Sequence, residues 1–510
     1  MKKQVRTLVI ISAAVLVLVG LLLALIFLLP EKDEEESSET SSQPTIKVVS
    51  KTADSEGKTV DQPVKRVEIK NEKDEFIIAQ NDEKQLLVKG YEDLPVGTYE
   101  IESLTGELSS LTASREISSD SVNLDDYGLD KPRATAEVTY HDDSKITFEL
   151  GNDASGDAGC YVRIDKKGPI YVVNSYFAEQ LLKESVMYIG TSLITPLEAR
   201  KDDTSSGTGG NDTAVMKNMK LSGTVRKEPL EFGVNTRTDD SAYSTFNYLI
   251  TSPLLKGTGD SAANIAQSAT SLDAVRAVKA HPTAAQLKEY GLDKPYSVCE
   301  LTLAVQTFTS TDDDETVTTY YNSTKHIIKL GKKDKDGNYY ALVDDYNAVY
   351  LLSSGSVPWA ETQFNDIVTP LLFLRDITTV KSIEVNAEGR KTTFELTHYP
   401  EKEDRDESLV VKAGGKTYPT DDFRSLYQVF MSIYRYNDAD KKPTGNPDIA
   451  FTVNPIDPKD TKVNARFYRN DASLYTCVLS DKDVFTVKAS EIDKFIRGLT
   501  NYLDGKPVTA

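Results

Sequence analysis

Two identical hexapeptides carry the most specific candidate binding residues in this sequence. Tyr127-Gly-Leu-Asp-Lys-Pro132 returns letter for letter as Tyr290-Gly-Leu-Asp-Lys-Pro295. Each copy sets an acid beside a base, a pair that can hold a polar ligand through charge-assisted hydrogen bonds. A structural interpretation competes, because glycine after a helix permits a left-handed cap, leucine packs back on the helix and proline prevents its continuation. We expect the structural role, and keep as candidate ligand contacts the charged residues of both copies: Asp130, Lys131, Asp293 and Lys294.

The sequence contains no spacing typical of a metal site or a catalytic triad. Its four histidines are scattered, without the H-E-x-x-H or H-x-H spacing that places two imidazoles on one metal. Asp334-Lys-Asp-Gly-Asn338 resembles part of a calcium loop but lacks the downstream glutamate, so we predict a hairpin turn. G-x-S-x-G, P-loop and dinucleotide motifs are also missing. We therefore predict no metal and no cofactor, and favour a protein that is not an enzyme.

Cysteines and tyrosines are the other residues that could do chemistry. Each of Cys160, Cys299 and Cys477 lies in a strand-like segment without C-x-x-C spacing, so we expect buried free thiols. Tyrosine is abundant, with 26 residues, and a row of tyrosines on one sheet face can stack on sugars or peptides. Core packing is the expected role of those that recur at matching positions of the repeats: Tyr161, Tyr171, Tyr340 and Tyr350.

The segments around the two hexapeptides repeat as well. Each copy is followed by an alternating strand (134–140 and 297–303), a strand that closes in Leu-Gly, a turn, and two further strands. A third, degenerate copy fills the C-terminal part, with Gly445-Asn-Pro447 in place of the hexapeptide. We define module 1 as residues 64–200, module 2 as 213–375 and module 3 as 376–505.

Each module is predicted to hold two or three strands, a helix, about four more strands and a short helix. Period-two alternation and short turns are typical of antiparallel strands joined as hairpins. Residues 421–434 and 491–503 show the helical spacing of apolar residues. The predicted fold class is therefore α+β: an N-terminal transmembrane helix, then tandem modules of mostly antiparallel sheet with one or two helices each.

The N-terminus is predicted to anchor the protein in a membrane. The apolar run from Leu8 to Leu29 is long enough to cross a hydrocarbon core of about 30 Å. Basic residues precede the run and acidic residues follow it, which places the N-terminus in the cytoplasm and the modules outside. We assign 1–30 to a cytoplasmic tip and transmembrane helix; a cleaved signal peptide is the alternative.

Residues 31–63 are polar and acidic and are predicted to form a disordered stalk.

The charge of the chain excludes one class of partner. The whole chain has 79 acidic and 59 basic residues and a net charge of -20, which repels phosphate backbones. We therefore expect no nucleic acid partner.

The doubled hexapeptide, its Leu-Gly and Tyr-Val strands and the single N-terminal membrane helix resemble the bacterial family called domain of unknown function 4340. Members are often encoded beside ABC-transporter genes, so the resemblance implies a transporter-associated envelope protein; it supplies no catalytic residues. We expect an extracytoplasmic, membrane-anchored interaction protein that is an accessory of an ABC-type transport system, with transporter subunits or other envelope proteins as partners. Two alternatives stay open. One is a cell-wall or polysaccharide-binding protein. The other is a hydrolase with an unrecognised carboxylate site, because the sequence has 79 acidic residues and does not show which of them could form a catalytic pair.

Overall fold

The computed structural model describes residues 45–509 apart from 53–57, 59–61, 118–121, 157–158, 199–211, 311–315, 405–406 and 440. The predicted membrane segment, Leu8 to Leu29, lies outside the described residues. Among the helices that are described, none has the length and apolar character needed to cross a bilayer.

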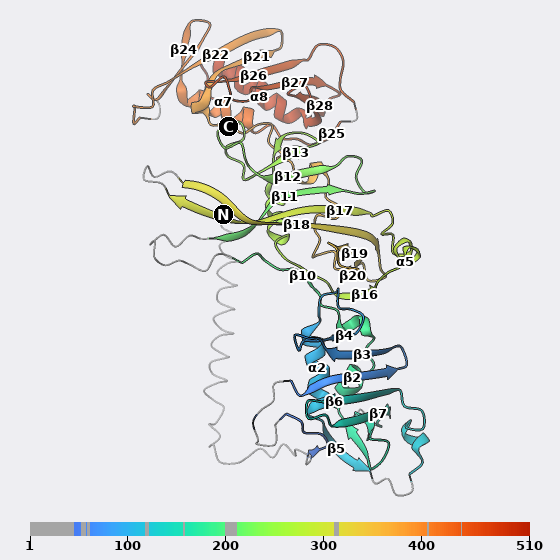
Figure 1. The fold of residues 1–510 in the computed structure, drawn as a ribbon. Helices are drawn as coiled ribbons and strands as arrows, with labels where there is room; N and C mark the ends of the chain where they lie inside the picture. The colour runs from blue at the N-terminus through green and yellow to red at the C-terminus, as the bar shows by residue number, and fades with distance from the viewer. Residues whose placement is uncertain are drawn as a thin grey trace, which may run out of the picture.

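Three antiparallel sheets of nine strands each stand in a row (Figure 1), with module 1 at one end, module 2 in the middle and module 3 at the other end. In chain order, module 1 consists of β1 (Ile46–Lys47), β2 (Val64–Asn71), β3 (Glu75–Gln80), β4 (Leu86–Val88), α2 (Thr98–Ser109), β5 (Thr112–Ile117), η1 (Leu124–Tyr127), β6 (Ala134–Tyr140), β7 (Lys145–Asp153), β8 (Cys160–Ile164), β9 (Ile170–Val173), α3 (Ser175–Leu181), η2 (Ser185–Tyr188) and β10 (Ser192–Ile194).

Module 2 has a similar succession of elements, with a fourth strand in the meander that precedes its main helix. They are β11 (Thr213–Ser222), β12 (Leu230–Val234), β13 (Tyr248–Ser252), β14 (Lys256–Gly257), α4 (Asp260–Ser268), β15 (Leu272–Asp273), β16 (Arg276–Ala280), α5 (Ala284–Glu289), β17 (Ser297–Ser310), β18 (Thr316–Lys333), β19 (Tyr339–Val343), β20 (Ala348–Leu352) and α6 (Phe364–Ile367).

Module 3 follows the 3₁₀ turn η4 (Ile377–Thr379). Its elements are β21 (Val380–Ala387), β22 (Arg390–His398), β23 (Leu409–Ala413), β24 (Lys416–Tyr418), α7 (Thr420–Met431), β25 (Asn437–Asp438), β26 (Ile449–Pro455), β27 (Val463–Arg469), β28 (Leu474–Leu479), β29 (Asp483–Lys488) and α8 (Ala489–Leu503).

The strand order confirms the tandem repeat. Module 2 is ordered β14-β13-β12-β11-β17-β18-β19-β20-β16, and module 3 has the identical order β24-β23-β22-β21-β26-β27-β28-β29-β25. Module 1 shares eight of these positions, from β4 to β5, and adds β1 at the outer edge. In each module one strand that follows the main helix (β5, β16 or β25) pairs with the last strand of the module's sheet in sequence (β9, β20 or β29). That pairing joins segments far apart in sequence, which local patterns do not reveal.

One face of each sheet is buried and the other faces solvent. In β2, Val67 and Ile69 point into the core while Glu68 and Lys70 alternate with them on the exposed side. The helices cover the buried face: α2 and α3 in module 1, and α7 and α8 in module 3, contribute side chains to the respective cores. The predicted mostly antiparallel α+β architecture is therefore confirmed for the described residues.

The predicted disordered stalk over 31–63 is wrong for residues 46–49, in the middle of the stretch. Ile46 pairs with Ala113 of β5, and Val49 is buried in the core of module 1. Although the stretch is mostly polar, the apolar residues at 46, 48 and 49 pack against the core of module 1, and burial of their side chains stabilises β1 at the edge of that sheet.

Candidate functional site

The hexapeptides end helices, as the structural interpretation predicts. Gly128 and Gly291 have positive φ angles of 68° and 74°. The next residue in each copy, Leu129 or Leu292, is buried, and its amide donates back to the carbonyl of Leu124 or Leu287. These bonds satisfy carbonyls that the helix end would otherwise leave open.

A close backbone contact explains why Leu-Gly recurs downstream of each copy. A Cβ atom on Gly151 would lie 2.1 Å from the carbonyl oxygen of Tyr127, and one on Gly331 would lie 2.2 Å from that of Tyr290. Only glycine, which has no side chain, allows the end of the helix to lie this close to the strand. The hexapeptide and the Leu-Gly pair are thus two halves of one packing contact.

The charged residues of the hexapeptides lie on the surface. Asp130 and Lys131 are exposed in module 1, and Asp293 and Lys294 are exposed in module 2. Within the described ranges no hydrogen bond or ion pair joins the two copies. Their role as ligand contacts stays a prediction, although Lys294 borders a groove described below.

The other candidates from the sequence are structural. Asp334 closes the β18–β19 hairpin by accepting hydrogen bonds from the amides of Asp336 and Asn338, both at 2.9 Å. No group of three potential metal ligands was found among the described residues. The three cysteines are free and buried, as expected, and burial raises the pKa of the Cys160 thiol to about 12.

The repeated tyrosines mostly pack against other parts of the protein. Tyr161 contacts the hexapeptide Tyr127 edge-on, with ring centroids 4.9 Å apart, and Tyr340 lies 4.6 Å from Tyr290. Tyr350 is fully buried. Tyr161 and Tyr340 thus hold the helix ends of the two hexapeptides on the sheet.

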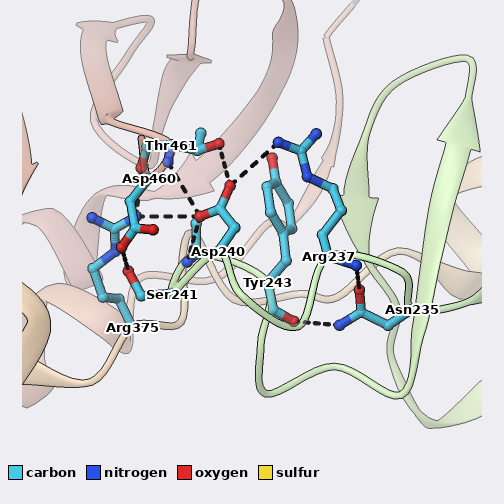
Figure 2. Close-up of polar contacts among 9 residues, drawn as sticks. Asn235, Arg237, Asp240, Ser241, Tyr243, Arg375, Asp460 and Thr461 are labelled. Atoms are coloured by element: carbon cyan, nitrogen blue, oxygen red, sulfur yellow. Dashed lines mark hydrogen bonds and ion pairs between the residues drawn. The ribbon is translucent and has the colours of Figure 1, made fainter. Parts of the chain in front are cut away.

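The most developed polar site among the described residues lies between modules 2 and 3 (Figure 2). It begins with the loop that joins β12 to β13. Asn235 donates to the carbonyls of Tyr243 and Phe246 at 2.9 and 2.8 Å and accepts from the amide of Arg237 at 2.7 Å. This bracing fixes the loop so that Asp240 points toward module 3.

Asp240 binds the loop between β26 and β27 of module 3. Its carboxylate accepts from the Thr461 hydroxyl at 2.7 Å, the Thr461 amide at 3.2 Å and the Ala242 amide at 3.0 Å. Ser241 donates to Asp460 beside it. Burial opposes ionisation of Asp240, but the hydrogen bonds from Thr461 and Ala242 outweigh it, so the pKa of this carboxyl is lowered.

Arg375 supplies the opposite charge from the segment that links the modules. Its side chain is fully buried, 4.0 Å from Asp240, and it donates through Nη2 to the Thr461 carbonyl. Its own carbonyl accepts from the Tyr427 hydroxyl at 2.9 Å. Nε and Nη1 of Arg375 have no partner among the described residues. Removal of Asp240 would therefore take away one of the two carboxylates, Asp240 and Asp460, that offset this buried charge.

A second ion cluster lies on the other side of the same junction. Asp483 of β29 is buried between Lys256 of module 2, at 2.9 Å, and Arg435 of module 3. Arg435 also contacts Asp438 at 3.3 Å, and Asn365 of module 2 donates to Asp438. Two separate clusters thus fix the orientation of module 3 on module 2.

The space between the clusters is too small for an organic ligand. The cavity has a volume of about 60 Å³ and is bordered by Phe246, Leu372 and Phe373 as well as by Thr461 and Asp483. Ligand pockets usually measure about 300–1,000 Å³. The one acid that lines it, Asp483, is already held by Lys256 and Arg435, so the geometry is that of a joint.

Modules 1 and 2 are joined differently. β10 at the end of module 1 pairs with β15 of module 2, and Leu193 and Ile194 enter the core of module 2. At the rim, His281 of module 2 lies 2.9 Å from Asp93 of module 1, and this hydrogen bond lowers the pKa of Asp93. The segment that ends module 1 is therefore part of its neighbour.

Sequence reasoning missed the residues of the module 2–3 junction. The loops that carry Asp240 and Thr461 have no counterpart in the repeated motifs. One signal was available: Arg375 directly follows four apolar residues, 371–374, a setting in which a charge needs a buried partner.

Comparison with known proteins places the chain. Residues 87–243 and 256–443 match a family model described as Domain of unknown function (DUF4340). Neither the curated proteins nor the solved structures gave a match. Each matched segment starts at the strand before a module's main helix and runs into the first part of the next module. Since these segments span well over half of the sequence, the chain belongs to the DUF4340 family.

Proposed function

We propose that this chain is an extracytoplasmic, membrane-anchored interaction protein, an accessory of an ABC-type transport system, whose three modules act as one rigid rod. The observation that carries the proposal is the joint between modules 2 and 3, where Asp240 and Arg375 of module 2 both bind Thr461 of module 3. The apolar run from Leu8 to Leu29 supports the anchor, and the family resemblance supports the transporter.

The rigid rod follows from the chemistry of the joints. Domains connected by small polar interfaces are expected to move relative to each other. Here a strand pair joins modules 1 and 2, while the hydrogen bonds of Asp240 with Thr461 and the buried ion pair of Lys256 with Asp483 join modules 2 and 3. Buried ion pairs demand one geometry because a displaced partner leaves a charge without compensation. Such a rod holds the exposed sheet faces of its three modules at fixed distances from one another, which suits a protein that bridges partners.

Co-purification tests the proposal. The tagged full-length chain is cross-linked in its own cells, purified from membranes and analysed by mass spectrometry. We expect permease or ATPase subunits of an ABC system to be enriched over an unrelated tagged membrane protein. Asp240→Ala, which loosens the joint, should lower their recovery, whereas Asp239→Ala removes the same charge from an exposed neighbour and should not.

Two results would contradict the proposal. One is purification without any transporter subunit. The other is a module region that resists protease in intact cells but is cut after lysis, because the modules would then lie inside. Recovery of cell-wall glycan in place of transporter subunits would favour the polysaccharide-binding alternative.

A further inference from the structure

A groove of about 390 Å³ lies beside the second hexapeptide in module 2. Its lining residues include Gly291 and Gly331 at the helix stop, and the side chains of Tyr296, Lys294, Lys333 and Glu361. We call it the Tyr296 groove. Its volume falls in the range of about 300–1,000 Å³ that is usual for small-ligand sites.

One wall of the Tyr296 groove is aromatic. The rings of Tyr296 and Tyr339 are stacked, with an interplanar angle of 20° and centroids 6.1 Å apart. Tyr339 is buried and its hydroxyl donates to Glu361 at 2.7 Å, so the ring pair is held in place. Tyr296 is only partly buried, which leaves ring surface toward the groove.

The rest of the lining is positively charged. Lys294, Lys332 and Lys333 border the groove, against the single acid Glu361. Lys333 lies 3.0 Å from Glu361 and 4.7 Å from the centre of the Tyr339 ring. Glu361 is thus paired with one lysine, and two lysines remain in excess, although the chain as a whole has a net charge of -20.

The corresponding place in module 1 is built differently. Arg133 follows the first hexapeptide where Tyr296 follows the second, and it pairs with Asp153 at 2.8 Å. Arg133 also lies 3.7 Å from Glu72. An ion pair therefore stands where module 2 has an aromatic ring and lysines. The repeat has kept the helix stop in both modules and changed only the surroundings of the Tyr296 groove.

We propose that the Tyr296 groove binds an anionic saccharide, with a sugar ring on Tyr296 and its acidic group among the lysines. A sugar ring offers a flat apolar face to an aromatic side chain, and the excess lysines complement a negative charge. An extended peptide is the less suitable occupant, because peptides commonly add to a free strand edge. Here β18 pairs with β17 on one side and with β19 on the other, including Lys333 with Tyr339, so β18 has no free edge beside the groove.

Titration calorimetry of the purified full-length chain tests this site independently of any transporter. The probes are a glucuronic acid hexasaccharide, a glucosylated glycerol-phosphate oligomer, neutral maltohexaose and hexaglutamate peptide. We expect one or both acidic saccharides to bind, more weakly at higher salt, and the neutral sugar and the peptide to bind at least tenfold more weakly. The two acidic probes distinguish a carboxylate from a phosphodiester source.

Matched variants locate the site. We expect Tyr296→Ala to weaken binding about tenfold, the factor that the loss of one stacking contact produces, while Tyr296→Phe keeps the affinity. Lys294→Ala should weaken binding and Glu361→Gln should strengthen it, because the two changes alter the charge of the groove in opposite directions. Lys131→Ala alters the same hexapeptide position in module 1 and should have no effect. Circular dichroism and the melting temperature establish that each variant is folded.

Three results would overturn the proposal: no binding of either acidic saccharide, equal or tighter binding of hexaglutamate, or an equal loss of affinity in the Lys131→Ala variant. The second result would assign the Tyr296 groove to an acidic peptide.

Discussion

Removal of the Asp240 carboxylate should loosen a loop in the neighbouring module. In Asp240→Ala the Thr461 amide and hydroxyl lose their charged acceptor, and Arg375 loses one of the two carboxylates near it. The affected loop, 457–463, belongs to module 3, whereas the substitution is in module 2. An effect there can arise only across the joint.

The size of the effect follows from the contacts. A hydrogen bond to a charged group contributes about 1.5–3 kcal/mol. Taking the lower value for each of the two bonds from Thr461 gives a loss of about 3 kcal/mol in the free energy that keeps the loop closed. Every 1.4 kcal/mol corresponds to a factor of ten, so amide exchange in the loop should accelerate about 100-fold.

Hydrogen exchange with mass spectrometry on peptides that cover 457–463 measures this directly. Asp239→Ala is the control: Asp239 is exposed and adjacent, and its removal changes the net charge by the same amount. Exchange in that variant should match the wild type. If Asp240→Ala left the exchange of 457–463 within twofold of the wild type, or if Asp239→Ala accelerated it equally, the joint would not depend on this carboxylate.

Two further predictions concern packing and pH. Gly331→Ala should destabilise module 2 by about 2 kcal/mol and lower its melting temperature by roughly 5 °C in calorimetry. The reason is that the new Cβ atom would lie 2.2 Å from the Tyr290 carbonyl oxygen. Gly355→Ala is the control: the nearest atom to its new Cβ would be 3.8 Å away, so this variant should unfold like the wild type. The folded pKa of Asp240 is below the ordinary 3.8, so its stabilisation is present above that pH and is lost as the pH falls below it. Denaturant unfolding of the wild type and Asp240→Asn should therefore show a stability difference that is constant at neutral pH and narrows in acid, and a difference that widens in acid would refute this.

Much of the fold was predictable because its causes are local. Alternation of apolar and polar residues in segments such as Ala134–Tyr140 predicts strands with one buried face, and short turns predict antiparallel hairpins. The letter-for-letter hexapeptide identified two modules, and weaker patterns identified the third. The pairings of β5, β16 and β25 with β9, β20 and β29 could not be predicted, because a long segment separates the two strands of each pair in the sequence.

The candidate site could be predicted from the sequence only in part. The helix-stop role of the hexapeptides was correct because glycine, leucine and proline act on the few residues beside them. Lys294 was a candidate from the sequence, but the Tyr296 groove was not, since Tyr296 and Glu361 meet only when the sheet forms.

The sequence by itself determined the strands, the helix stops, the repeated unit and the free thiols, since these depend on residue type and short spacing. Only the tertiary structure decided how the modules are joined, because Asp240, Arg375 and Thr461 come from three segments that approach each other after two modules have folded. Charge pairs of this kind depend on distance in space, and the order of residues along a chain does not contain that distance.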